Sequence, residues 1–127
     1  MNHILYIDNY LCYRKISMRL ENEIVMNHAD YVLILKSLAD ETRLKIVEML
    51  SKGELCACKI LENFNITQPT LSYHMKTLCD SGLVEGRRDG AWMIYSLNKE
   101  SLEAVRNLFD NYCSSDMSDS GEKSRKC

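Results

Sequence analysis

The strongest constraint on the fold is a capped helical segment that begins at Thr67 and is followed at once by a hairpin signal. Thr67 is a favourable N-cap, and Pro69 falls in the first helical turn, where its missing N–H costs nothing. Asp80-Ser81-Gly82 is typical of a helix end. The apolar positions recur at helical spacing and predict a buried stripe made of Leu71, Met75 and Leu78, with Cys79 beside them.

The segment after Gly82 predicts a hairpin of two strands. Residues 83–88 and 91–97 are rich in β-formers, and Asp89-Gly90 lies between them. An Asp-Gly pair between two such runs is the strongest short-range hairpin signal. We therefore expect a helix followed by a two-stranded wing, with its turn at Asp89-Gly90.

Helical patterns also flank this unit. Residues 30–38 are apolar around most of the helix circumference, so this helix is expected to be buried on more than one side, one of them against a second subunit. Asp40 is expected to cap the next helix and Asn98 the last one. A further short helix is predicted to start at Glu54. The short helix is expected to bury Leu55, Cys58 and Leu61. The two capped helices are expected to carry apolar stripes at helical spacing, made of Leu44, Val47 and Leu50 in the first and of Leu102, Val105, Leu108, Phe109 and Tyr112 in the last.

These elements predict a mainly α fold with a small β-hairpin, a dimeric winged helix-turn-helix. Residues 29–113 form the expected winged helix-turn-helix domain. Residues 1–28 are expected to be a partly ordered N-terminal extension. Within it, residues 1–26 follow neither a strict helical nor a strict strand period and are expected to hold one short irregular helix. Residues 114–127 are polar and are expected to be a flexible tail.

Composition limits the compartment and the partners. No apolar run approaches the roughly 20 residues that a membrane span needs, so we expect no membrane partner. The first ten residues contain Asp8 and lack the basic and apolar regions of a secretory signal. The six cysteines are therefore expected to be thiols in the cytoplasm. A net charge of −2 argues against a general nucleic-acid coat but permits a local DNA-docking face.

The polar face of the helix after Thr67 has the chemistry of major-groove readout. Amides and hydroxyls hydrogen-bond to base edges, and basic side chains hold phosphates. Arginines beside the hairpin tip suit phosphate or minor-groove contacts. The candidate DNA-binding residues are Gln68, Thr70, Ser72, Tyr73, His74 and Lys76 on the helix, and Arg87 and Arg88 on the wing.

Four segments in order make the sequence similar to the ArsR-type metalloregulatory repressors, over about residues 30–113. They are Leu38-Ala39-Asp40-Glu41-Thr42-Arg43-Leu44, Gly53-Glu54-Leu55-Cys56-Ala57-Cys58, Gln68-Pro69-Thr70-Leu71-Ser72-Tyr73-His74-Met75-Lys76 and the Asp89-Gly90 hairpin. The resemblance implies a homodimer that represses a resistance operon when metal-free and leaves its double-stranded operator when metal binds. It also implies that the first and last helices of the core form the dimer interface.

Cys56 and Cys58 are the candidate ligands for the inducer. Two residues span about 200° of a regular helix, so the thiols would lie on opposite sides and could hold one ion only if the first turn opened. As(III) and Sb(III) are thiophilic, and sulfur ligands suit them. The alternative structural interpretation is that Cys58 is a core residue and Cys56 a bystander.

A third sulfur is missing from the usual family position, where this chain has Leu61. Cys12 is a candidate donor, similar to the N-terminal arm of cadmium- and lead-sensing members. Cys113 and Cys127 are rivals, and Cys79 is more simply a core residue. A Cd(II)- or Pb(II)-sensing repressor using Cys12 with the pair, or a thiol-redox sensor, therefore stays open. An enzymatic dithiol is not expected, because no strand is predicted before Gly53 as a thioredoxin-like site would require.

Overall fold

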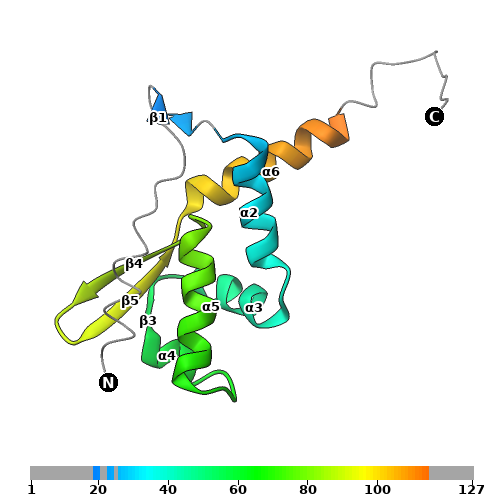
Figure 1. Cartoon of the computed structure of the whole chain (residues 1–127). Coiled ribbons are helices and arrows are strands. Elements are labelled where there is room, and N and C mark those ends of the chain that lie inside the picture. Colours follow the sequence, from blue (N-terminus) through cyan, green and yellow to red (C-terminus); the bar gives the residue numbers. More distant parts are fainter. Residues whose placement is uncertain (1–18, 21–22, 25, 115–127) are drawn as a thin grey trace, which may run out of the picture.

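A computed structural model of the chain describes residues 19–20, 23–24 and 26–114. Cys12, Cys127, most of the expected N-terminal extension and nearly all of the expected tail lie outside these residues. Figure 1 shows the helices gathered on one side of the hairpin. In chain order the elements are β1 (Arg19–Leu20), β2 (Glu23–Ile24), α2 (His28–Leu38), α3 (Glu41–Leu50), β3 (Leu55–Cys56), α4 (Ala57–Leu61), α5 (Gln68–Asp80), β4 (Val84–Asp89), β5 (Trp92–Leu97) and α6 (Lys99–Ser114).

This order is the predicted winged helix-turn-helix, and side-chain caps explain where its helices begin. Asp40 caps α3 by accepting from the Arg43 N–H at 3.1 Å, and Thr67 caps α5. Asn98 accepts from the N–H of Ser101 at 3.1 Å at the start of α6. Each cap satisfies a backbone donor that the first helical turn leaves unpaired.

The sheet has three strands rather than the predicted two. Their order is β3-β5-β4, with all neighbours antiparallel. Leu55 and Cys56 had been assigned to a helix starting at Glu54, but they are extended and pair with Tyr95 and Ile94 of β5. That assignment was wrong because the pairing joins segments about 40 positions apart, which a local pattern does not register.

The wing turns one residue later than predicted. Asp89 pairs with Trp92, so the two-residue loop consists of Gly90 and Ala91. Gly90 has φ of 63°, in the left-handed region that glycine adopts without a Cβ clash. A glycine at the first loop position is one of the two favoured hairpin solutions.

The core lies between the helices and the inner face of the sheet. The predicted stripe of α5 is confirmed, because Leu71, Met75, Leu78 and Cys79 are at most 3% exposed. In α3 the prediction for Leu44 was wrong, since it is 53% exposed and Ile46 is buried in its place. Every helix from α2 to α6 contributes to the buried set, as do the strands of the wing. Its further members are Ile34, Val47, Leu50, Ile60, Leu83, Val84, Met93, Tyr95 and Val105.

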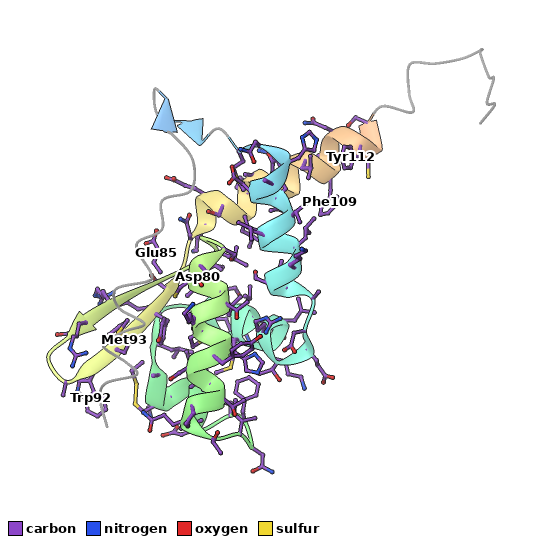
Figure 2. All side chains as sticks on the ribbon, viewed as in Figure 1. Asp80, Glu85, Trp92, Met93, Phe109 and Tyr112 are labelled. Atoms are coloured by element: carbon purple, nitrogen blue, oxygen red, sulfur yellow. A yellow bond between two sulfur atoms is a disulfide. The ribbon has the colours of Figure 1, made fainter. Side chains whose placement is uncertain are left out.

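Two helices leave apolar side chains outside this core. Val32, Leu33 and Leu35 of α2 are 36–46% exposed, although Ile34 beside them is fully buried. Phe109 and Tyr112 of α6 are 45% and 57% exposed, and Figure 2 shows both near the far end of that helix. Within one chain, α2 is therefore buried on one side, with its remaining apolar surface uncovered.

The short antiparallel pair β1–β2 joins Arg19–Leu20 to Glu23–Ile24. The short irregular helix expected within residues 1–26 stays a prediction, because residues 1–18 lie outside the described part. No helix among the described residues is long and apolar enough to cross a membrane.

Candidate thiol site and nucleic-acid interface

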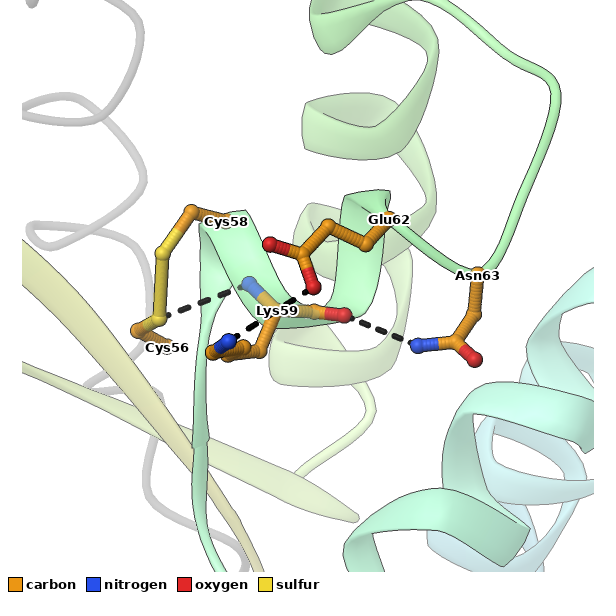
Figure 3. Close-up of a disulfide and its surroundings, with 5 residues drawn as sticks. All are labelled: Cys56, Cys58, Lys59, Glu62 and Asn63. Carbon is orange, nitrogen blue, oxygen red and sulfur yellow. Dashed lines mark hydrogen bonds and ion pairs between the residues drawn. A yellow bond between two sulfur atoms is a disulfide. The ribbon is translucent and has the colours of Figure 1, made fainter.

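The two thiol positions meet because Cys56 lies outside the helix. Cys56 is the last residue of β3 and the N-cap of α4, with φ −77° and ψ 157°. Its Sγ accepts from the Lys59 N–H at 3.4 Å, while Cys58 lies in the first turn. The two Cα atoms are 5.4 Å apart and the sulfurs are bonded as a disulfide (Figure 3). The expectation that the thiols lie on opposite sides of a helix was therefore wrong.

The pair is accessible rather than part of the core. Cys58 is exposed and Cys56 is half-buried, so the predicted burial of Cys58 was wrong. The core residue of α4 is Ile60, which is fully buried one turn from the helix start. Because both sulfurs project from the same strand-to-helix junction, one soft ion could bond to both of them without unwinding α4.

Other sulfur atoms lie elsewhere in the described chain. Cys79 is 1% exposed within the core of α5, and Cys113 is exposed near the end of α6. Among the described residues no three Cys, His, Asp or Glu side chains gather where they could hold an ion. Cys12 and Cys127 are outside those residues. The described donor set thus fits a two-sulfur site.

A pocket of about 270 Å³ adjoins the thiol pair on the side of α5 and the wing. Its wall combines residues from α4, α5 and the β5 edge of the hairpin, and most of them are apolar. The lining residues are Ala57, Cys58, Leu61, Gln68, Leu71, Ser72, Met75, Ala91, Trp92, Met93 and Tyr95.

Helix α5 presents part of the predicted polar face. Gln68 and Thr70 are exposed in its first turn, and Tyr73 is 64% exposed one turn later. Lys76 is half-buried, and its Nζ lies 3.0 Å from the Asp80 carboxylate. The exposed Gln68, Thr70 and Tyr73 are therefore presented by one end of the helix.

Ser72 was predicted on that exposed face and His74 on its flank, as a DNA-face or packing residue, but they are only 6% and 9% exposed. Ser72 lines the pocket beside the wing, and His74 is covered by the start of α3. The assumption that a polar stripe must face solvent was wrong at these two positions, because α5 is packed on more than one side.

An Arg43 network connects His74 to the rest of the helical layer. Arg43 Nη1 lies 3.1 Å from His74 Nδ1, and Arg43 Nε donates to the Ser37 carbonyl at 2.6 Å. Arginine has no acceptor atom, so the guanidinium donates and Nδ1 accepts in this bond. The Asp40 carboxylate lies 3.9 Å from the same Nδ1. Arg43 thereby joins α2, α3 and the buried side of α5.

The sequence predicted Asp40 as the cap of α3, whereas Arg43 was only a family-like position without a role. The hydrogen bond from the Arg43 N–H is the main cause that lowers the pKa of Asp40, and the nearby Arg43 charge acts in the same direction. The charged form of Asp40 is thus favoured at the N-terminus of α3, where a negative charge also complements the helix dipole.

On the wing, Arg87 is engaged by Glu54 immediately before β3. The two guanidinium nitrogens lie 2.6 and 2.9 Å from the two carboxylate oxygens. This bond holds the pKa of Glu54 below its ordinary value. Arg88 is exposed on the neighbouring position. The role of Glu54 was missed from the sequence, because its partner is distant in the chain.

The sheet register links the thiol pair to the same arginine. Cys56 lies opposite Ile94 of β5, and Ile94 lies opposite Arg87 of β4. Cys56 and Arg87 therefore occupy one row across the three strands. The Glu54–Arg87 ion pair bridges the same two outer segments through side chains.

Comparison with known proteins agrees with this arrangement. The family profile described as "Bacterial regulatory protein, arsR family" matches residues 40–86, which run from the cap of α3 into β4. The chain is 46% identical over 91 residues to an arsenical resistance operon repressor of Staphylococcus xylosus, covering 72% of this chain and 88% of that protein.

A protein of the same description from Staphylococcus aureus is 49% identical over 84 residues, covering 65% of this chain and 81% of the relative. A solved structure from Mycobacterium bovis, described as a homodimeric winged helix-turn-helix DNA-binding domain, superimposes with a TM-score of 0.55 at 24% identity. The match covers 73% of this chain and 89% of that one.

The fold and these relatives identify a regulator rather than an enzyme. The chain belongs to the arsR family of bacterial regulatory proteins.

Proposed function

We propose that the chain is a homodimeric repressor that binds operator DNA and releases it when As(III) or Sb(III) bonds to Cys56 and Cys58. The observation that carries this proposal is the position of the thiol pair, at the junction between a wing-paired strand and the helix before α5. The relatives named as arsenical resistance operon repressors favour an arsenical as the inducer.

The proposed DNA contacts are made by those predicted DNA-binding side chains that the structure leaves accessible to solvent. Gln68, Thr70 and Tyr73 would read base edges or hold phosphates from α5, because amide and hydroxyl groups at a helix N-terminus suit both tasks. Lys76 and Arg88 would contact phosphates. Ser72 and His74 would act through their neighbours, Ser72 at the pocket wall and His74 through the Arg43 network.

Arg87 would have a dual role in this mechanism. In the structure the positive charge of its guanidinium is paired with the Glu54 carboxylate, and this ion pair reduces the attraction of Arg87 for phosphate. Glu54 lies two residues before Cys56, so a displacement at the thiol pair would alter this ion pair. Inducer binding and phosphate contact would therefore influence the same few residues of the wing.

The proposed dimer rests on the uncovered apolar surface of α2 and α6. Val32, Leu33, Leu35, Phe109 and Tyr112 would be covered by a second copy of the chain. Burial of such side chains contributes about 25 cal/mol per Å² of apolar surface. Operator binding would place the dimer where the DNA is, in the bacterial cytoplasm.

Two alternatives use the same thiols. A repressor sensing Cd(II) or Pb(II) would add Cys12, since these ions favour further thiolates. A redox sensor is favoured by a specific observation, because the two sulfurs are bonded to each other in the structure. In that case oxidation of the dithiol, instead of metalloid binding, would shift the wing.

The test uses the reduced full-length protein and a duplex selected by that protein from random sequence. Cys56→Ser and Cys58→Ser should retain operator binding but lose release by arsenite and antimonite. Cys113→Ser is the matched control, because it removes an exposed thiol far from β3 and should release normally. Loss of operator binding in the Cys56 or Cys58 variant as severe as in Gln68→Ala would contradict the sensor assignment. Parallel titrations with Cd(II), Pb(II) and an oxidant separate the alternatives.

A further inference from the structure

We propose that the pocket beside Cys58 receives the organic substituent of a monosubstituted trivalent arsenical whose arsenic bonds to Cys56 and Cys58. This inference rests on the proposed function and names the class of inducer more narrowly. Its starting point is a mismatch of valence, because arsenic in this state forms three bonds and the described site offers two sulfurs. An arsenical that carries its own carbon substituent fills the third bond itself.

The pocket has the size and lining for that substituent. An apolar cavity of about 150 Å³ binds a benzene ring. The pocket beside Cys58 measures about 270 Å³, so it can hold a phenyl group. Leu61, Leu71 and Met75 form one wall, and Trp92 and Met93 line the wing side. A hydroxide in the third arsenic position would leave this mostly apolar lining without an apolar partner.

The same pocket contacts the DNA-reading elements. Gln68 and Ser72 belong to α5, and Trp92 lies at the start of β5, near the tip of the hairpin in Figure 2. A phenyl group in the pocket would therefore press on α5 and the wing while its arsenic is anchored at α4. This contact gives the substituent a direct route to operator release.

The bonding step involves no redox change. With phenylarsine oxide, the As–O bonds and two S–H bonds break, two As–S bonds form, and the oxygen leaves as one water with the two thiol protons. Arsenic stays trivalent throughout. The protein must enter as the dithiol, so it is first reduced with a phosphine, which adds no competing thiol, and the phosphine is then removed.

The pocket is tested by narrowing it from two sides. Leu61→Phe adds volume on α4, and Ala91→Leu adds volume at the wing rim. Leu44→Phe makes the same chemical change as the first variant at an exposed position that does not line the pocket. Trp92 is the single tryptophan of the chain and lines the pocket, so its emission reports binding without DNA.

For Leu61→Phe and Ala91→Leu we expect the affinity for phenylarsine oxide to fall at least tenfold relative to the unmodified protein, about 1.4 kcal/mol. Their affinity for arsenite should change less than about twofold, and Leu44→Phe should change neither. If both pocket variants retain phenylarsine oxide affinity, or lose arsenite affinity by the same factor, the pocket assignment is wrong. Failure of the proposed repressor function would look different, since neither arsenical would then release the operator from the unmodified protein.

Discussion

Arg43 should contribute more to stability than any exposed arginine, because its side chain joins three helices. Its Nε donates to the Ser37 carbonyl at 2.6 Å and its Nη1 to His74 Nδ1 at 3.1 Å, and both partner residues are buried. Lysine keeps the positive charge, but its one ammonium group cannot reach both acceptors in the same geometry. Arg43→Lys therefore loses at least one charged hydrogen bond and leaves a buried acceptor without it.

A hydrogen bond that involves a charged group contributes about 1.5–3 kcal/mol, so we expect the free energy of unfolding to fall by about that amount. The matched control is Arg106→Lys, whose side chain is 66% exposed and pairs with Glu103 and Asp110 on the same helix. Exposed pairs of this kind contribute about 0–1 kcal/mol.

The assay is urea unfolding at one fixed protein concentration, because association of subunits makes the midpoint concentration-dependent. With a slope of about 1–3 kcal/mol per M, Arg43→Lys should lower the midpoint by about 1 M and leave the slope unchanged. Equal midpoints for the Arg43 and Arg106 variants would refute the view that this network holds α5 in place.

The DNA interface and the acid response give two further tests. Lys76→Ala and Arg88→Ala should each flatten the log–log dependence of operator affinity on salt concentration, by about 0.9 in slope per lost phosphate contact. Glu54→Gln should make this dependence steeper, because it releases Arg87 for a phosphate contact. Unchanged slopes in all three variants would exclude these residues from the interface. The pKa of Asp40 is lower in the folded protein than in the unfolded chain. The charged carboxylate therefore contributes its full stabilisation of the fold above the ordinary pKa, and this contribution is lost as the pH falls through the pKa of the folded state. The stability advantage over Asp40→Asn, measured by urea unfolding, should therefore be constant above about pH 5 and shrink from there to about pH 3. A difference that stays constant over this lower range would contradict the prediction.

Sequence patterns that act within a few residues predicted the helices and the hairpin whose conformation depends on neighbouring residues. The cap at Thr67, the helical spacing of Leu71, Met75 and Leu78, and the Asp-Gly pair were sufficient for α5 and the hairpin, because each acts within a few residues. The strand β3 escaped prediction, because its pairing partners Tyr95 and Ile94 lie far away in the sequence.

The choice of the two cysteines as ligands stays a prediction, and their geometry was not predicted. The sequence identified Cys56 and Cys58, but their meeting point depends on the strand-to-helix junction. Ser72 and His74 were assigned to solvent, because a helical projection shows one buried stripe and cannot show that the wing and α3 cover two more positions. The pocket also depends on three elements that only the fold brings together.

The two-residue length of β3 limits the free energy that couples inducer binding to operator binding. Two residue pairs join β3 to β5, so roughly two backbone hydrogen bonds are available, at about 0.5–1.5 kcal/mol each. A coupling free energy of about 1–3 kcal/mol changes an affinity by about 5- to 150-fold. Thermodynamic reciprocity requires the operator to weaken inducer binding by that same factor. A protein of this design, acting through β3, would therefore bind its inducer most tightly when it is off the DNA, and free repressor would buffer the inducer before promoter-bound repressor responds.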